Sequence, residues 1–368
     1  MSEGAIAVSG LSVVQTLAPG LPVIQSLRDE PEFKRPIVGL SHDPLDPPNY
    51  DTALVDASFL IPYPMYGSAR LLERLLRAHS QRPLAAIVPT LDSELPLYAV
   101  LEQKLADEGI AVLVPKAETF DLRSKVRLAD ISRITGIPVP YTRAVYTYEA
   151  GMAFAREFQL PFMVKGHLHG ATMVMSWDQF APAIQNQIAA FGYPIVLQQY
   201  IPGTEFDVAA LGSRTGSLIG AVPMKKLQLD GMGKAWGGIT VADPELVEMA
   251  QRVVERLRWP GPLELELMRH ATSGQLYLLE INPRFPAWIH LTVSAGQNLP
   301  WALVRILLGE DVAPFAGYHA GVMSLRRSID ITCSLGIYES LVIHGEVDHH
   351  NLDAELIRPQ WVSSRTAR

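Results

Sequence analysis

The chain has 368 residues, of which 48% are hydrophobic and 19% are charged, and its formal net charge is −7. This length suits two or three domains, and the composition is typical of a folded soluble protein. Acidic and basic residues are mixed, with no block of Lys and Arg, so no nucleic-acid partner is expected.

A single cysteine, Cys333, leaves no disulfide framework and no cysteine-based metal site within the chain. We therefore expect a cytoplasmic location, where thiols stay reduced. The first segment, 1–20, lacks a basic stretch followed by a long apolar run, so it does not resemble a signal peptide. No apolar segment reaches the roughly 18 residues that a membrane span needs, so no membrane partner is expected.

Strand-like and helix-like patterns alternate up to about residue 118. The expected strands are 5–10, 35–43, 83–96 and 110–115, and the expected helices are 69–80 and 95–109. Alternation of this kind predicts a mostly parallel sheet. Ligands of such sheets bind at the C-terminal strand ends, where Asp92 and Glu94 lie, although helix capping is the role that we favour for this pair.

The pattern changes after residue 118. We first expect a helix ending at Gly136, followed by strands at 161–166 and 194–201 with a helix between them. Antiparallel strands over 206–229 come next, and then a helix N-capped by Asp243. A hairpin over 263–282 and two late strands at 320–330 and 339–347 complete the list. Arg326 and Arg327 fall in the first late strand and should point to opposite faces.

The hairpin combines an apolar face with an acidic one. Strand side chains alternate, so the leucines of "LELEL" share one face while Glu264 and Glu266 share the other. On the return strand, we expect Tyr277, Leu279 and Ile281 to pack inward. Glu280 and Asn282 would then face the same side as Glu266.

Two carboxylates about 4 Å apart repel by roughly 4 kcal/mol at an effective dielectric of about 20. A divalent cation relieves this repulsion, and ligands that offer only oxygen suit Mg²⁺ or Mn²⁺, which often share their shell with phosphate oxygens. The alternative is a solvated strand face, and a solvated neighbour is how we interpret Glu264. The following Pro283–Arg284 pair adds a cation beside the acidic cluster.

The segment "LLEINPR", together with a Glu fourteen residues before its own Glu, resembles the metal-binding hairpin of the ATP-grasp superfamily. The similarity is to the branch with the carbamoyl phosphate synthase large subunit and D-alanine–D-alanine ligase. Further similar pieces are "IVPTLDSEL", "SKVRLADISRITGIPVP", "PFMVKG" and "VLQQYIPGTEFDVAAL", while "GKAWGGITV" resembles a substrate-side loop. The combination is specific, whereas any one piece alone is weak.

The resemblance implies an α/β fold with an α+β core. It implies a Rossmann-like preATP-grasp domain over 1–118 and an ATP-grasp domain over 119–312, with a small lobe of about 122–200 and a large lobe of about 201–312. Residues 313–368 would supply C-terminal strands that complete the large lobe.

The resemblance also implies roles for individual residues. Lys125 and Lys165 would contact the α- and β-phosphates of ATP, and Glu205 would accept hydrogen bonds from the ribose hydroxyls. The adenine contacts would come from the Gln198 side chain and from the backbone of Gln199 and Ile201.

The metal and the reacting groups are assigned in the same way. Glu266, Glu280 and Asn282 would hold Mg²⁺ (or Mn²⁺). Lys226, or its neighbour Lys225, would reach the γ-phosphate, and Arg284 would clamp a substrate carboxylate or the transferring phosphoryl group.

The sequence departs from the usual pattern at the phosphate loop, "KGHLHGATMV", which has two histidines, His167 and His169, and only two glycines. The usual acidic residue at the adenine position is Gln198, and the bulky "FPAWIH" follows Arg284. Trp288 in this segment is either a wall of the substrate pocket or a buried packing residue.

The implied activity is that of an ATP-dependent carboxylate–amine ligase that forms an amide or peptide bond through an acyl phosphate, with a thiol as a less favoured acceptor. The substrates would be small carboxylates and amines of amino-acid or peptide type, and dimers are common among relatives, so a homodimer is an open expectation. Two other classes compete: a non-catalytic nucleotide-binding partner protein of the same fold, and an NAD-dependent oxidoreductase. The second needs a G-x-G-x-x-G fingerprint, which the N-terminal segment lacks.

Overall fold

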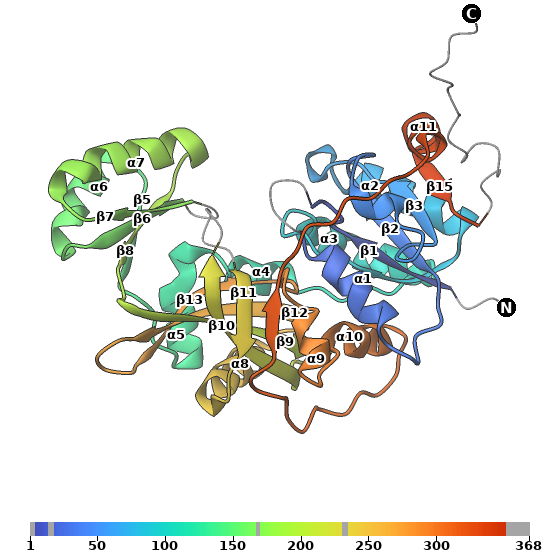
Figure 1. Ribbon diagram of the computed structural model, residues 1–368. Coiled ribbons are helices and arrows are strands. Elements are labelled where there is room, and N and C mark those ends of the chain that lie inside the picture. The colour runs from blue at the N-terminus through green and yellow to red at the C-terminus, as the bar shows by residue number, and fades with distance from the viewer. Residues whose placement is uncertain (1–3, 14–17, 167–169, 230–234, 351–368) are drawn as a thin grey trace, which may run out of the picture.

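The computed structural model describes residues 4–13, 18–166, 170–229 and 235–350, which form three sheets (Figure 1). The six-stranded sheet lies between the N-terminal five-stranded sheet and a four-stranded sheet. In the described part of the chain, no helix is long and apolar enough to cross a membrane.

The N-terminal sheet has the order β15-β3-β2-β1-β4. Its elements are β1 (Ala5–Ser9), β2 (Ile37–Ser41), β3 (Ala57–Leu60), β4 (Leu84–Val88), β15 (Glu346–Asp348), α1 (Gly20–Arg28), α2 (Ser68–Gln81) and α3 (Leu95–Asp107). Strands β1 to β4 are parallel, as expected, and β1 and β2 are buried along their whole length because α1 covers one face and α2 and α3 the other. The strand expected at 110–115 is wrong, since only an isolated bridge joins Ala111 to Ala86.

The four-stranded sheet has the order β5-β8-β6-β7. Its elements are β5 (Thr142–Val145), β6 (Phe162–Gly166), β7 (Ala171–Val174), β8 (Ile195–Gln199), α6 (Tyr148–Phe154) and α7 (Trp177–Phe191). The helices pack on one face around a core that includes Phe158, Phe162 and Phe180. Lys165 of β6 lies on the other face, which these helices do not cover.

The six-stranded sheet has the order β13-β12-β9-β10-β11-β14. Its strands are β9 (Gly203–Gly212), β10 (Leu218–Leu229), β11 (Ala235–Thr240), β12 (Gly261–His270), β13 (Leu276–Asn282) and β14 (Met323–Leu325). The helices around it are α5 (Leu128–Thr135), α8 (Pro244–Leu257), α9 (Leu291–Ser294) and α10 (Leu299–Leu307). Residues 235–240 thus form a strand and not the loop expected from "GKAWGGITV".

The two faces of this sheet have different neighbours. Helices α5 and α8 pack on the face that carries Leu263, Leu265 and Leu267. Behind the opposite face, one continuous hydrophobic core joins Leu211 of β9 and Leu303 of α10 to Ile24 of α1 in the N-terminal domain. This shared core fixes the N-terminal domain against the sheet that carries the candidate site.

The tail differs from the expected pair of strands. Strand β14 is short and pairs with β11, whereas residues 335–344 form helix α11 (Leu335–His344) in place of a strand. Strand β15 then pairs antiparallel with β3, and ion pairs of Arg74 with Glu346 and of Arg82 with Asp348, each 3.2 Å long, hold it there. The tail therefore adds strands to two sheets and not to the large lobe alone. The domain limits at 118 and 312 stay a prediction.

We predict that Leu303→Ala, which removes a fully packed side chain from the shared core, lowers the free energy of unfolding by about 2–5 kcal/mol. Chemical denaturation measures this loss. Val100→Ala on α3, where the parent side chain is 69% exposed, is the control and should change the same quantity by less than about 0.5 kcal/mol. Equal effects of the two substitutions would contradict the shared core.

Candidate functional site

The hairpin β12–β13 brings the expected acidic residues together. Glu266 lies opposite Glu280 in the strand register, and Glu264 lies opposite Asn282. Asn282 Nδ2 donates to Glu264 Oε2 and to Glu266 Oε1, both at 3.1 Å. The juxtaposition of Glu266, Glu280 and Asn282, expected from strand alternation, is therefore present.

A β-bulge sets this arrangement. The register skips between Glu266 and Leu267, so Leu279 is an extra residue on β13. As a result Leu276, Leu278 and Ile281 are buried, and the expected inward packing of Tyr277 and Leu279 is wrong. Without the bulge, a strict period of two would put Leu278 on the same face as Glu280.

A third carboxylate extends the row onto β9. Asp207 lies opposite Glu266 on the other side of β12, and its side chain is almost completely buried. Asp207 was not among the residues expected at the site, although its position two residues after Glu205 puts both on one strand face. Three adjacent strands thus present Asp207, Glu266 and Glu280 in line.

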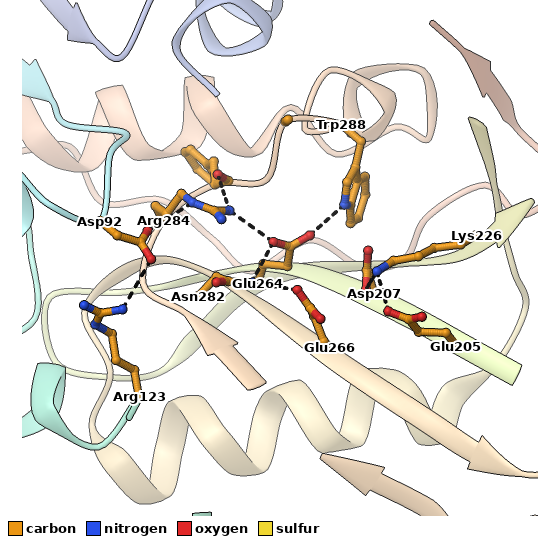
Figure 2. Close-up of polar contacts among 12 residues, drawn as sticks. Asp92, Arg123, Glu205, Asp207, Lys226, Glu264, Glu266, Asn282, Arg284 and Trp288 are labelled. Carbon is orange, nitrogen blue, oxygen red and sulfur yellow. Dashed lines mark hydrogen bonds and ion pairs between the residues drawn. The ribbon is translucent and has the colours of Figure 1, made fainter. Parts of the chain in front are cut away.

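Lysines neutralise part of this row. Lys226 Nζ lies 2.5 Å from Glu205 Oε1 and 3.2 Å from Asp207 Oδ1, and Lys125 Nζ lies 2.9 Å from Glu280 Oε1 (Figure 2 shows the Lys226 pairs). Burial acts to lower the pKa of Lys226, but the charges of Asp207, Glu266 and Glu205 outweigh it and raise that pKa.

Lys165 of β6 belongs to the same electrostatic group. Burial and the positive charge of Lys125 lower the pKa of Lys165, while Glu280 and Glu266 act in the opposite direction. The four-stranded sheet therefore contributes a lysine to the acidic row on the six-stranded sheet. Lys125 itself lies in the short 3₁₀ helix η3 (Lys125–Arg127) between the two sheets.

Glu264 is not the solvated neighbour that we expected. It is 6% exposed and accepts hydrogen bonds from Trp288 Nε1 at 2.8 Å and from Asn282, and it pairs with Arg284 Nη1 at 3.1 Å (Figure 2). Trp288 is 8% exposed and lines a cavity, so it is both buried and a pocket wall. Glu264 thus fixes the segment that follows the hairpin.

The N-terminal domain reaches this site through Asp92. Its Oδ1 lies 3.1 Å from Arg284 Nε, and its Oδ2 accepts from Arg123 at 3.4 Å (Figure 2). The helix-capping role expected for Asp92 is therefore wrong. No local sequence signal identifies this pair, because Asp92 and Arg284 come from different domains.

Glu94 does not cap a helix through its side chain either. It is 1% exposed, accepts from Ser9 Oγ, and lies 2.7 Å from Nε2 of His42. The His42 ring stacks on Tyr63 with centroids 5.1 Å apart. Glu94 is thus a buried acceptor inside the N-terminal domain and not part of the acidic row.

The residues expected at the adenine lie at the end of β8 and in the connection to β9. Gln198 is buried, and its Nε2 donates to Thr142 Oγ1 at 3.2 Å. The Gln199 N–H donates to the Tyr141 carbonyl at 2.8 Å, and Ile201 is 4% exposed. Their adenine contacts, like the ribose contact of Glu205, stay predictions. His167 and His169 lie outside the described residues.

The donor set of the hairpin fits a magnesium-type cation. Two carboxylates and an amide oxygen are the oxygen ligands that Mg²⁺ and Mn²⁺ accept. Burial and the charge of Glu266 raise the pKa of Glu280, although Lys125 and Lys165 act to lower it. The two lysines therefore do not fully neutralise the carboxylates of Glu266 and Glu280. Within the described ranges, no three His, Cys, Asp or Glu side chains form a complete metal site, so the remaining ligands would have to come from phosphate or water.

Comparison with known proteins agrees with this geometry. A profile of the family described as "ATP-grasp in the biosynthetic pathway with Ter operon" matches residues 192–325, which include the whole hairpin. Two solved structures are similar across most of the chain: a biotin carboxylase from Campylobacter jejuni in complex with β,γ-ATP, and an L-amino acid ligase from Bacillus licheniformis. The chain has the ATP-grasp fold.

For the biotin carboxylase the TM-score is 0.68 at 16% identity, covering 86% of this chain and 73% of that one. For the L-amino acid ligase the TM-score is 0.60 at 15% identity, covering 84% and 75%. The carbamoyl phosphate synthase large chain of Agathobacter rectalis is 26% identical to this chain over 259 residues. That match covers 66% of this chain and 24% of the relative, so the chain spans about a quarter of its length. The expected α/β fold class and the family resemblance are confirmed.

We predict a pH-dependent contribution of His42 to stability. Burial acts to lower the pKa of His42, but its hydrogen bond to Glu94 and the charge of Glu94 outweigh burial and raise that pKa. The contribution is then fully present below the unfolded-state pKa, about 6.5, and is lost as pH rises through the raised pKa. His42→Gln should therefore lower the free energy of unfolding more at about pH 5.5 than at about pH 9.

Denaturant titrations of both proteins at the two pH values measure this difference. Met65→Gln, at a side chain that is 85% exposed and does not titrate, is the control and should give a change that does not vary with pH. A His42→Gln loss that grew with pH would show that the imidazole is bound in its neutral form.

Proposed function

We propose that the chain is an ATP-dependent carboxylate–amine ligase that forms an amide or peptide bond through an acyl phosphate, converting ATP to ADP and phosphate. One observation carries the proposal. The oxygen ligands on the β12–β13 hairpin face Lys125 and Lys165, which come from η3 and from the four-stranded sheet. Oxygen ligands beside converging lysines suit a triphosphate with its divalent cation.

In this proposal Glu266, Glu280 and the Asn282 amide oxygen hold Mg²⁺ or Mn²⁺ against the phosphates. When bound, the cation supplies charge that offsets the negative charge on the phosphoryl oxygens. The contacts of Asn282 Nδ2 with Glu264 and Glu266 orient its oxygen, because both amide hydrogens are then engaged.

Lys125 and Lys165 bind phosphate oxygens in this scheme. The Gln198 side chain and the backbone of Gln199 and Ile201 face the adenine. Lys165 is well suited to this role. Its pKa is lowered because partial desolvation disfavours the charged ammonium, and the negative charge of a bound phosphate would stabilise that ammonium.

Lys226 is the better of the two candidates for the γ-phosphate. Its side chain lies on the acidic face beside Glu205 and Asp207, whereas Lys225 is the next residue on β10 and points to the other face. Glu205 would therefore share its oxygens between Lys226 and the ribose hydroxyls. Asp207 keeps Lys226 in place when Glu205 turns to the nucleotide.

The reaction has two steps. A carboxylate oxygen of the first substrate attacks the γ-phosphorus, the bond from that phosphorus to the bridging oxygen of ADP breaks, and an acyl phosphate forms. The amine then attacks the acyl carbon, inorganic phosphate leaves, and the amine loses a proton. Arg284 binds the carboxylate or the phosphoryl oxygens through Nη2 of its guanidinium, while Asp92 and Glu264 hold Nε and Nη1. Positioning and charge neutralisation supply the catalysis.

Similar proteins support this class over its rivals. An L-amino acid ligase is named for joining amino acids, and the biotin carboxylase carries an ATP-type ligand. An NAD-dependent oxidoreductase would leave the acidic hairpin without a role. A non-catalytic nucleotide-binding protein would not need Arg284 held by two carboxylates. Cytoplasmic location and a homodimer stay predictions.

We predict that Glu280→Gln lowers ATP turnover in the presence of carboxylate and amine by a factor on the order of 10² or more, because the variant loses one charged cation ligand. Phosphate release measures the turnover, first across a panel of amino acids and small peptides. The circular dichroism spectrum should stay that of the parent. Glu73→Gln, on an exposed turn of α2, is the control and should leave turnover unchanged. Parent-like turnover of Glu280→Gln would remove the metal assignment.

We predict that Lys165→Ala raises the Kd for ATP about tenfold to a hundredfold, the loss expected for a charge-assisted hydrogen bond. Calorimetric titration with Mg²⁺ present measures this affinity. Lys104→Ala on the exposed side of α3 is the matched control and should bind ATP like the parent. An unchanged Kd for Lys165→Ala would exclude this lysine from the phosphate site.

A further inference from the structure

A cavity of about 600 Å³ lies between the N-terminal domain and the six-stranded sheet. Its walls come from α1, from the turn η1 (Pro47–Tyr50), from β11 and from the segment that follows β14. Leu54 and Met224 supply apolar surface, and Trp236 and Trp288 supply two indole rings. This volume is within the range of small-molecule sites and exceeds what a single small amino acid fills.

The two tryptophans differ in how they are held. Trp288 is 8% exposed and its Nε1 is fixed by Glu264, so its ring is a rigid wall. Trp236 of β11 is 38% exposed, and the guanidinium carbon of Arg326 lies 5.7 Å from the centre of its ring. A large, half-open indole inside a cavity offers a flat surface on which a planar or bulky apolar group can pack.

Positive charge gathers at one side of this cavity. Arg326 and Arg327 both follow the end of β14 and line it. They do not lie within the strand, as the sequence analysis expected. Arg326 also donates to the Ala287 carbonyl at 3.4 Å, which holds it beside the segment with Trp288. Arg327 is exposed and has no carboxylate partner among the described residues.

The other ionisable groups among the described residues of the cavity wall are His290 and Asp51. His290 pairs with Asp29, whose Oδ2 lies 2.7 Å from its Nε2. Asp51 is the carboxylate among the described lining residues, and it accepts a hydrogen bond from the Ala53 N–H. Among the described lining residues, the guanidinium of Arg327 thus adds positive charge beside that of Arg326. An anionic group is the ligand that this wall favours.

The cavity adjoins the candidate active site through one residue. The Trp288 ring lines the cavity, while its Nε1 bonds to Glu264, which pairs with Arg284 (Figure 2). A molecule that fills the cavity thus lies next to the segment that carries Arg284.

We propose that this cavity binds the non-reacting part of a substrate of the ligase: an anionic group on Arg326 and Arg327, joined to a flat or bulky apolar body that packs on Trp236 and against Trp288. This proposal rests on the ligase function proposed above. The substrate class is that of an amino acid with a large apolar side chain, which binds here through its own carboxylate and reacts through its amine.

Three probes test the two halves of this claim by calorimetry, without turnover. N-acetyl-L-tryptophan has both the ring and the charge, N-acetyl-L-tryptophanamide lacks the charge, and N-acetyl-L-alanine lacks the ring. We expect the first to bind the parent protein at least about tenfold more tightly than either of the others. Equal affinity for all three probes, or no binding of the first, overturns the proposal.

Variants locate the binding. Trp236→Ala and Arg327→Ala should each weaken N-acetyl-L-tryptophan at least about fivefold, and Arg327→Ala should leave the affinity for the uncharged amide unchanged. The matched controls are Trp177→Ala, whose parent ring is 50% exposed on α7, and Arg252→Ala on the exposed side of α8, neither of which lines this cavity. Controls that weaken the probe as much as the cavity variants overturn the assignment.

The outcomes separate the two proposals. Selective probe binding with no ATP turnover under any substrate would leave the cavity assignment and remove the ligase. ATP turnover that depends on Glu280, together with loss of the probe pattern, would leave the ligase and remove this substrate class.

Discussion

The structure depends on the partial burial of a row of carboxylates across three adjacent strands. Asp207, Glu266 and Glu280 lie on neighbouring strands of one sheet face, and Glu264 lies beside them. Like charges so close together are unfavourable unless cations compensate them. The surrounding elements supply those cations.

Each compensating cation comes from a different part of the chain. Lys226 comes from the neighbouring strand, Lys125 from the turn between the sheets, and Lys165 from the four-stranded sheet. Arg284 follows the hairpin and is itself shared with Asp92 of the N-terminal domain. In the function proposed above, the charges that bring these three units together are also the ones that would bind a triphosphate and its cation. The contacts that assemble the fold would then assemble the site as well.

The sequence allowed the hairpin to be predicted because its information is local. Alternation in "LELEL" and the spacing to Asn282 were sufficient to place Glu266, Glu280 and Asn282 on one face. The bulge at Leu279 was not predictable in the same way, since period-two counting assumes an unbroken ladder. That error reversed the expected burial of Tyr277 and Leu279 without disturbing the acidic face.

Contacts between distant segments were beyond the sequence argument. Asp92 has no local sign that its partner is Arg284, and Glu264 resembles a solvent-facing strand residue until Trp288 is folded over it. Residues 335–344 combine β-branched and apolar residues in a way that suits either a strand or a helix, and tertiary packing selected the helix. Asp207, by contrast, had a usable signal in its spacing from Glu205.

The pairing of β15 with β3 has a consequence for the order of events during synthesis. The N-terminal sheet draws its outermost strand from residues 346–348, far along the chain, while its other four strands end at residue 88. Until the ribosome has passed that distant stretch, β3 keeps an uncovered edge whose backbone groups can recruit foreign strands. The amino-terminal domain therefore lacks its edge strand until residues 346–348 have been made, although its other four strands are made well before them.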